Sequence, residues 1–364
     1  PYLKDWCNKK SIHIVESSDI LTHSTHTAAD IQALIDTYDI SITPRDYQIA
    51  AFKFALEYDR GMILSPTASG KSLIIYMLCR HYINMIDNNI LIIVPTTSLV
   101  EQLYKDFKDY GFDVDKNVSR KYHGYDIDLD KRITISTWQS LYKMPKKFFE
   151  DYGAVIGDEA HLFKAVSLTK IMTKLTDCKY RIGLTGTLDD SKTHKLVLQG
   201  LFGMVNKVVS TAELIDRKQL ANLKVVCLNL KYPETESKKV KDVKYFEELE
   251  YITSSKPRNK YIRNLALALK GNTLLLFQLV EKHGEILFNL IKEKADPKRK
   301  VFFVYGGTET DDREKIRAIT EKSDNAIIVA SFGTFSTGIN IRNLHNIVFS
   351  SPTKSPIRVL QSIG

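Results

Sequence analysis

The sequence lacks the features of disulfide-stabilised, secreted and membrane-spanning proteins. Its 364 residues include only four cysteines, which stand far apart and form no C-x-x-C pair. This usage excludes a disulfide framework or a zinc knuckle and fits a reducing compartment. The longest apolar runs, such as residues 90–94 and 274–277, are far shorter than the ~20 residues that span a bilayer. Residues 2–11 are polar and charged, without the apolar core of a secretory signal. We therefore expect a cytoplasmic protein with no membrane partner.

The composition is that of an ordinary globular protein with an excess of basic residues. Hydrophobic residues make up 43% and charged residues 26% of the chain, which excludes a disordered or fibrous protein. At roughly 100–200 residues per domain, the length predicts two or three domains. The 52 Lys and Arg exceed the 43 Asp and Glu, which gives a formal net charge of +9. This excess favours an anionic partner without identifying it.

Two segments of the chain alternate short apolar strands with amphipathic helices, a pattern typical of parallel sheets covered on both faces. In the first segment we expect strands at residues 61–65, 90–94, 132–136, 154–157 and 180–185, and helices at 45–57, 71–85, 98–110 and 167–176. In the second segment we expect strands at residues 272–277, 301–304, 325–330 and 346–350. No repeat of 20–50 residues accompanies them.

The pattern divides the chain into four parts. Residues 1–40 carry few structural signals and are interpreted as the remnant of an amino-terminal module or a linker. Residues 41–215 form the first α/β unit, and the charge-rich residues 216–256 connect it to the second, residues 257–364. Because the chain begins with proline and ends directly after a helical-looking stretch, we expect a second unit that lacks its C-terminal part.

A phosphate-binding loop is the strongest chemical signal. It follows the short strand GMIL, precedes a long apolar helix and consists of Ser65, Pro66, Thr67, Ala68, Ser69, Gly70, Lys71 and Ser72. This context is the one that a P-loop requires, because backbone N–H groups at the helix start bind phosphate. Lys71 would pair with the β- and γ-phosphates, and the Ser72 hydroxyl would ligate Mg²⁺. The strict pattern has glycine where Ser65 stands, and an ordinary glycine-containing turn is the alternative.

An acidic pair follows another expected strand. Residues 154–157 lead directly into Asp158-Glu159-Ala160-His161. Carboxylates at the carboxyl end of a buried strand lie where open α/β sheets bind ligands. Asp158 could hold Mg²⁺, and Glu159 could deprotonate the attacking water. Alone, the pair equally fits an acidic corner after a strand, but beside an upstream P-loop it indicates a site of ATP hydrolysis.

From Arg45 to its last residue, the sequence resembles the superfamily-two helicases and translocases, and within them the phage UvsW-type DNA helicases. Besides the P-loop and the acidic pair, the resemblance rests on residues 44–48, 94–102, 136–140, 184–187, 330–340 and 361–364, which stand in the order expected of that family. It implies adenine recognition by Arg45 and Gln48, and a nucleotide contact at Gly338. It also implies coupling of ATP state to DNA grip, which would involve His161, Thr185, Thr187 and Gln361. The implied DNA-backbone contacts are Thr96, Gln102, Thr137, Gln139, Thr334 and Thr337.

The resemblance also implies a fold and a substrate. The fold would be α/β, with two RecA-like parallel-sheet lobes and an ATP cleft between them. The implied activity uses ATP and Mg²⁺ to unwind or branch-migrate forked and branched DNA in replication or recombination. A phage-encoded protein would work in the cytoplasm of the host cell. The residues leave open a double-strand translocase that does not separate strands, a nucleotide-gated DNA clamp, and an RNA helicase, because hydroxyls and loop N–H groups bind phosphates of any nucleic acid.

Overall fold

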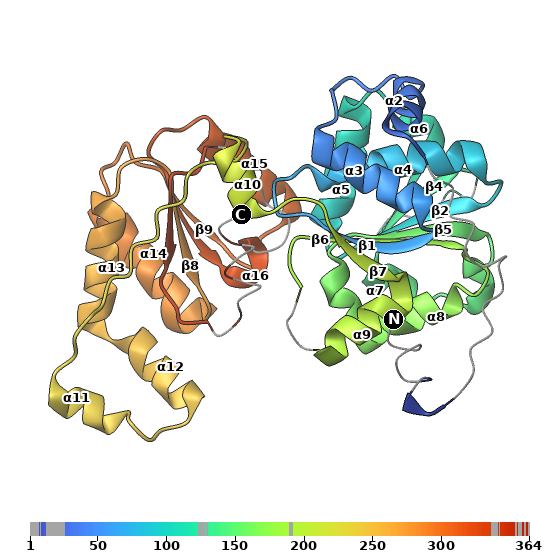
Figure 1. Ribbon diagram of the computed structural model, residues 1–364. Helices are drawn as coiled ribbons and strands as arrows, with labels where there is room; N and C mark the ends of the chain where they lie inside the picture. The colour runs from blue at the N-terminus through green and yellow to red at the C-terminus, as the bar shows by residue number, and fades with distance from the viewer. Residues whose placement is uncertain are drawn as a thin grey trace.

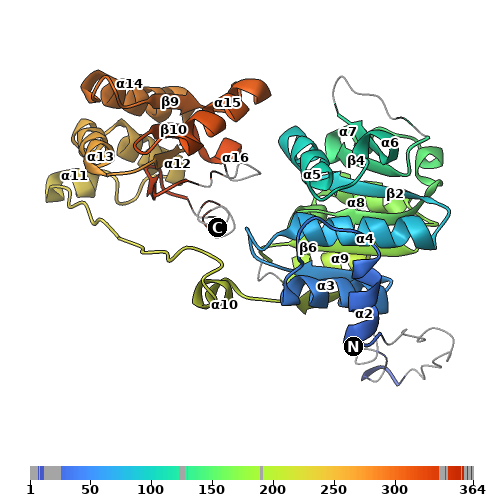
Figure 2. The same cartoon turned by 90° about the horizontal axis from the view of Figure 1, so that it is seen from above.

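Figures 1 and 2 show two α/β bodies, or lobes, joined by an extended segment. The computed structural model describes residues 7, 9–11, 26–122, 128, 130–188, 192–335, 341, 343–353, 355, 359 and 362. Both lobes are built on parallel strands, in sheets of seven and four. In the described part of the chain, no helix combines the length and the apolar character that crossing a membrane requires.

The first lobe contains the seven-stranded sheet, in the order β3-β4-β2-β5-β6-β1-β7. Its strands are β1 (Arg60–Leu64), β2 (Asn89–Val94), β3 (Val118–Lys121), β4 (Ile133–Thr137), β5 (Tyr152–Gly157), β6 (Tyr180–Thr185) and β7 (Met204–Lys207). The central strands β4 and β5 are buried along their whole length, because helices cover both faces of the sheet.

Side chains that alternate along each strand divide the first lobe into two apolar cores. Ile92 of β2 faces one core and its neighbour Leu91 faces the other. The first core is covered by α2 (Ala28–Asp36), α3 (Asp46–Glu57), α4 (Lys71–Met85), α5 (Thr97–Asp109) and the short α6 (Val114–Asn117). The second is covered by α7 (Trp138–Tyr142), η2 (Lys146–Phe149), η3 (Ala160–Lys164), α8 (Val166–Lys174) and α9 (Lys192–Phe202).

Helix α2 belongs to the first lobe by its packing. Thr27 and Asp30 form a capping box that begins the helix. Its residues Ile31 and Ile35, and Tyr38 just after it, are buried in the first core. Residues 27–38 therefore contribute to the same core as the strands.

The second lobe contains the four-stranded parallel sheet, in the order β11-β8-β10-β9. Its strands are β8 (Thr273–Phe277), β9 (Val301–Val304), β10 (Ile327–Ser331) and β11 (Asn346–Phe349). Its helices are α13 (Lys256–Ala268), η4 (Val280–Gly284), α14 (Glu285–Lys294), α15 (Thr310–Glu321) and α16 (Phe332–Phe335). Two apolar clusters lie on the two faces of this sheet, and the short helices α11 (Glu234–Lys239) and α12 (Tyr245–Ser254) precede it (Figure 1).

The segment that leaves the first lobe begins with α10 (Thr211–Asp216). Leu214 of α10 packs with Tyr47 of α3 and with Val209. Arg217 donates two hydrogen bonds to the carboxylate of Asp46, at 2.8 and 3.0 Å. The start of the connecting segment therefore packs on helix α3 and is hydrogen-bonded to it.

The expected pair of parallel-sheet lobes is confirmed. Every predicted strand and helix is present, with ends within two residues of the prediction. The prediction missed β3 and β7, the two edge strands of the large sheet. Both have only four residues, and polar side chains interrupt their apolar pattern, as is common at sheet edges.

Candidate active site

Strand order brings the main chemical motifs to one place. Strands β5, β6 and β1 are neighbours in the first sheet and run parallel, so their carboxyl ends lie side by side. The P-loop follows β1, and the acidic pair Asp158 and Glu159 follows β5. Thr185 ends β6, the strand between them. Three segments that are distant in sequence thus form one site.

Hydrogen bonds of two buried serines stabilise the conformation of the P-loop. The Ser65 hydroxyl donates to the Ser69 hydroxyl at 2.7 Å, and the Ser69 hydroxyl donates to the Pro66 carbonyl at 2.6 Å. Ser65, which replaces the usual glycine, is therefore used to close the loop. Ala68 and Gly70 both adopt positive φ, 61° and 79°, so the chain turns sharply before helix α4 begins.

The first turn of helix α3 contacts the P-loop directly. Nε2 of Gln48 donates to the carbonyls of Ser69 and Gly70, at 2.9 and 3.2 Å. The Tyr47 hydroxyl donates to the Ser69 carbonyl at 2.9 Å, and Arg45 donates to that same hydroxyl at 2.8 Å. The predicted adenine-reading pair thus lies beside the loop that would hold the phosphates.

The two carboxylates of the acidic pair differ in environment, because Asp158 is buried and Glu159 is only partly buried. Asp158 is only 7% exposed. Burial, and then the neighbouring Glu159 carboxylate, raise the pKa of Asp158 to about 6, against the lowering effect of Lys71. Lys71 Nζ lies 3.8 Å from Glu159 Oε1. Glu159 has a left-handed backbone, φ 50° and ψ 49°, a conformation that costs a non-glycine residue energy and is common at functional sites.

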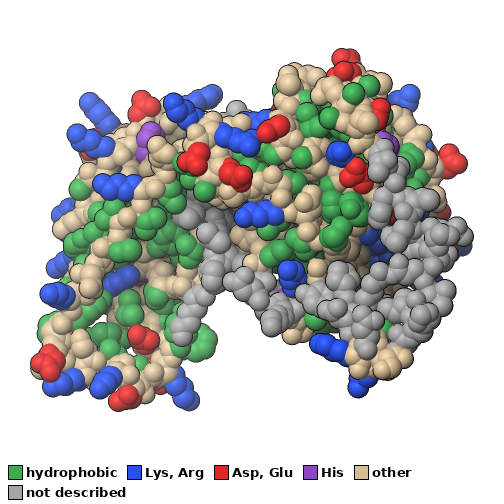
Figure 3. All heavy atoms as spheres, in the orientation of Figure 1, with side chains coloured by type: hydrophobic (Ala, Val, Ile, Leu, Met, Phe, Trp, Pro, Cys, Tyr) green, Lys and Arg blue, Asp and Glu red, His purple; other side chains and the backbone are tan. Residues whose placement is uncertain are grey.

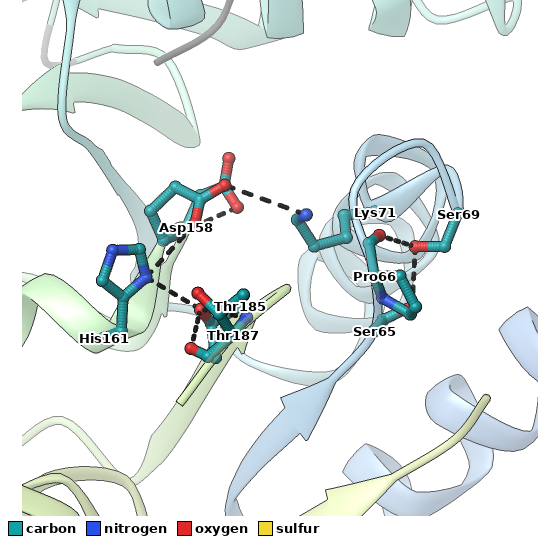
Figure 4. A network of polar contacts seen from close by, with 9 residues as sticks. Ser65, Pro66, Ser69, Lys71, Asp158, His161, Thr185 and Thr187 are labelled. Carbon is teal, nitrogen blue, oxygen red and sulfur yellow. Dashed lines mark hydrogen bonds and ion pairs between the residues drawn. The ribbon is translucent and has the colours of Figure 1, made fainter. Parts of the chain in front are cut away.

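A chain of polar contacts connects the acidic pair to the end of β6 (Figure 4). His161 Nδ1 lies 2.9 Å from Thr185 Oγ1 and 3.3 Å from Glu159 Oε2. The Thr185 hydroxyl donates its proton to the Thr187 carbonyl at 2.9 Å, so toward His161 it acts as an acceptor. Nδ1 therefore carries the imidazole proton and donates it toward both oxygens. Three of the four predicted coupling residues meet here.

The end of β6 also lies against the P-loop. The Ser65 amide donates to the Thr185 carbonyl at 2.9 Å. A Cβ atom on Gly186 would lie 3.2 Å from the backbone nitrogen of Thr67, so the two segments leave little room for a side chain there. The predicted coupling segment is thus in contact with both the acidic pair and the P-loop.

The predicted DNA contacts of the first lobe lie on the neighbouring strands. β2 and β4 are paired in the same sheet, and Thr96 and Thr137 stand at their carboxyl ends. The Thr96 hydroxyl accepts a hydrogen bond from the Leu99 amide at 3.4 Å and caps helix α5. The Thr137 side chain is buried, and its hydroxyl bonds to that of Ser140 at 3.0 Å. Both hydroxyls fix the turns at this edge of the sheet.

The two predicted glutamines of this edge are exposed. Gln102 lies on the surface of α5, and Gln139 lies on the surface of α7. Lys and Arg side chains are spread over the face seen in Figure 3 and interspersed with Asp and Glu. Charges of both signs are therefore mixed on this face, and the Gln139 amide lies 3.5 Å from the Pro95 carbonyl that follows β2.

In the second lobe, Thr334 follows β10. Its hydroxyl lies 2.7 Å from that of Ser331, and the residue is buried. The remaining predicted site residues, Thr337, Gly338 and Gln361, lie outside the described residues.

The residues of the first lobe fit a nucleotide and its magnesium ion. The Ser72 hydroxyl and the Asp158 carboxylate are hard oxygen donors, the type that Mg²⁺ prefers. In the described part of the chain, no cluster of three or more His, Cys, Asp and Glu residues could hold a metal ion by itself. This agrees with a magnesium site, because Mg²⁺ commonly takes only one or two protein ligands beside phosphate and water. The Thr187 hydroxyl is buried without a partner among the described residues, so a ligand atom or water is needed to satisfy it.

Two tyrosines of the site are not among the residues predicted from the sequence. Tyr47 lies inside the predicted adenine-binding segment, and its position next to Gln48 was a usable signal. Tyr110 lies 2.8 Å from the Ser72 hydroxyl but has no motif around it. Its proximity depends on how helices α4 and α5 pack.

A P-loop beside an acidic strand end on one parallel sheet, together with a second parallel-sheet lobe, defines a two-lobed nucleotide-binding protein of the RecA-like class. Comparison with known families agrees. Residues 41–190 match the type III restriction enzyme res subunit, and residues 258–364 match the helicase conserved C-terminal domain. The chain belongs to the superfamily-two helicase family.

A similar phage protein and its crystal structure support this placement. The chain is 37% identical over 330 residues to the ATP-dependent DNA helicase uvsW of Enterobacteria phage T4. The aligned region covers 89% of this chain and 65% of that protein. The crystal structure of T4 UvsW superposes with a TM-score of 0.53 at 33% identity, over 99% of this chain and 73% of that one. The expected resemblance is thus confirmed.

A more distant structure shows the fold alone. S. cerevisiae Dbp5 bound to RNA and ADP BeF3 has a TM-score of 0.61 at 14% identity, over 96% of this chain and 85% of that one. The chain spans slightly less than two thirds of the T4 helicase sequence, 65%.

Proposed function

We propose that this protein is an ATP- and Mg²⁺-dependent DNA helicase or translocase that acts on forked or branched DNA. The observation that carries the proposal is the chain of contacts from Lys71 through Glu159 and His161 to Thr185. It connects the groups suited to phosphate binding and water activation with the segment expected to respond to ATP state. The T4 relative, an ATP-dependent DNA helicase, supports the choice of DNA.

The residues suggest how hydrolysis would proceed. Lys71 would leave Glu159 and pair with the β- and γ-phosphates, which frees the Glu159 carboxylate to take a proton from the attacking water. Ser72 and Asp158 would hold Mg²⁺, which, when bound, neutralises charge on the phosphates. His161 would keep Glu159 in place, since its Nδ1 proton faces that carboxylate.

The same contacts suggest how hydrolysis would be coupled to movement. A shift of Glu159 would change its contact with His161 and thereby the position of Thr185, which ends a strand beside the P-loop. Two lobes whose closure depends on ATP would then step along one DNA strand. We propose Thr96, Gln102, Thr137, Gln139, Thr334 and Thr337 as positions of the DNA track, and Gly338 and Gln361 as nucleotide-facing positions of the second lobe.

We also propose that the chain divides into four parts. Residues 41–215 and 257–364 would be the two lobes, residues 216–256 the connector, and residues 1–40 a remnant or linker. Because residues 27–38 pack on the first core, we propose that the last part of this N-terminal segment belongs to the first lobe.

ATP hydrolysis and strand displacement test the proposal when both are measured on the same set of nucleic acids. The set comprises single-stranded, duplex, forked and four-way DNA, and RNA of matched length. We expect forked and four-way DNA to stimulate hydrolysis most and to be unwound. Displacement of a triplex strand without unwinding of a fork would instead identify a duplex translocase, and strongest stimulation by RNA would contradict a DNA helicase.

A further inference from the structure

The hydroxyl of Ser72 is held by a tyrosine from another helix. Tyr110 Oη lies 2.8 Å from Ser72 Oγ. Ser72 is in the first turn of α4, whereas Tyr110 is the C-terminal capping residue of α5. The Tyr110 ring lies 5.3 Å from that of Tyr76, one turn further along α4. The side chain thus follows the start of α4 and ends at the P-loop serine.

The surrounding structure fixes Tyr110 in this position. Its ring packs against the first core of the lobe. Its carbonyl accepts a hydrogen bond from the Ser41 amide at 3.3 Å, and the Ser41 hydroxyl donates to the Asp109 carbonyl at 2.7 Å. Both the ring and the backbone of Tyr110 are therefore restrained, so its hydroxyl has little freedom to leave Ser72.

The Tyr110 hydroxyl stays protonated at neutral pH. A phenol ordinarily loses its proton only near pH ~10. A protonated phenol can donate a hydrogen bond and also accept one. Tyr110 can therefore serve as an acceptor for the Ser72 proton whenever the serine oxygen is needed elsewhere.

Metal binding by a serine hydroxyl creates that need. The oxygen binds the ion through a lone pair, so its proton must point away from the ion and toward an acceptor. We propose that Tyr110 is a positioning residue that accepts the Ser72 proton and thereby directs a Ser72 lone pair at the Mg²⁺ of the bound nucleotide. The inference rests on the proposed function, because it takes Ser72 as a magnesium ligand.

Tyr110→Phe tests this role, because it removes the hydroxyl and keeps the ring that packs on Tyr76. The measurement is the affinity for a fluorescent ATP analogue, titrated with Mg²⁺ and separately in EDTA. Loss of an outer partner of a metal ligand commonly weakens metal binding by about 10–100-fold. We expect an apparent Mg²⁺ affinity about tenfold weaker, and an unchanged nucleotide affinity in EDTA.

A control on the same helix separates this effect from general disturbance. The Tyr104 hydroxyl also donates a short hydrogen bond, at 2.6 Å to Asp115 Oδ1, but it does so on the surface. Tyr104→Phe should leave both affinities unchanged. Because Tyr110 acts through Ser72, Tyr110→Phe should have no further effect in a Ser72→Ala background.

The outcomes distinguish the inference from the function on which it rests. Equal weakening by Tyr110→Phe with Mg²⁺ and in EDTA would reveal a merely structural tyrosine and overturn the proposal. An undiminished effect in the Ser72→Ala background would overturn it as well. A lack of any Mg²⁺ effect on nucleotide binding by the unchanged protein would contradict the proposed function itself.

Discussion

The imidazole Nδ1 of His161 lies 2.9 Å from the hydroxyl oxygen of Thr185. His161 lies in the short helix η3 after β5, and Thr185 ends β6. The same nitrogen lies 3.3 Å from Glu159 Oε2, so one proton is directed at both a carboxylate and a proposed coupling residue. This contact is the shortest route between the proposed catalytic base and the strand end that touches the P-loop.

Replacement of Thr185 by valine should uncouple hydrolysis from DNA. Valine keeps the shape of threonine but cannot accept the His161 proton, and an unsatisfied buried donor costs about 1–3 kcal/mol. We expect ATP binding to be retained and DNA stimulation of hydrolysis to fall by about tenfold, which steady-state ATPase assays with and without DNA would measure. Thr169→Val on α8, where the hydroxyl bonds only to backbone carbonyls, is the control. Equal DNA stimulation in both variants would contradict the coupling role.

Glu159→Gln should stop hydrolysis without preventing nucleotide binding. A positioned general base contributes typically 10²–10⁴-fold, so single-turnover hydrolysis should fall by at least about 100-fold. The Lys71 ammonium would lose its carboxylate partner and remain available to the phosphates. The control is Glu57→Gln, which removes a carboxylate paired with Lys53 on the surface of the same lobe. If phosphate release survives the Glu159 change, another residue is the base.

Acid should destabilise the second lobe through His283. This residue is fully buried, with Nε2 3.2 Å from Asn259 Oδ1 and Nδ1 3.0 Å from the Ser351 hydroxyl. Because Asn259 Oδ1 can only accept, Nε2 carries the proton of the neutral ring. Burial, and then Arg258, lower the pKa of His283 from 6.5 to about 4.

The direction of the pH effect follows from that lowered pKa. Between pH 6.5 and 4 the unfolded chain binds a proton at His283 and the folded one does not, so the free energy of unfolding falls as pH falls. The contribution is on the order of 3 kcal/mol. Denaturant titrations at several pH values should show a flatter dependence for His283→Gln, despite its lower stability at neutral pH. Parallel pH profiles of the two proteins would contradict this assignment.

Replacement by alanine should change the stability of the protein in opposite directions at two glycines near the end of the first lobe. Gly203 joins α9 to β7 with φ 107°, and a Cβ atom there would lie 2.7 Å from the Arg60 carbonyl oxygen. Gly203→Ala should therefore destabilise the protein by more than about 1 kcal/mol. Gly200 lies within α9, and a Cβ atom there would meet nothing within 4 Å. Gly200→Ala should stabilise by about 0.5–1 kcal/mol, and thermal unfolding of both variants would compare them.

The sequence alone determined the local chemistry and most of the strands. The P-loop was readable because its function requires particular residues in one short stretch between a strand and a helix. Interior strands such as β2, β5 and β8 were readable because burial on both faces makes them largely apolar. The short edge strands β3 and β7 have no such apolar pattern, because only two of their eight residues are buried.

Only the tertiary structure decided which of these local signals meet. The order β5-β6-β1 places Thr185 between the P-loop and the acidic pair, and no periodicity in the sequence encodes that order. Tyr110 reaches Ser72 from 38 positions further along the chain, through the packing of α4 on α5. Hydrogen bonds form only between atoms that lie about 3 Å apart. Residue patterns describe neighbours along the chain and not neighbours in space, so contacts between different helices and strands are fixed only by the tertiary fold.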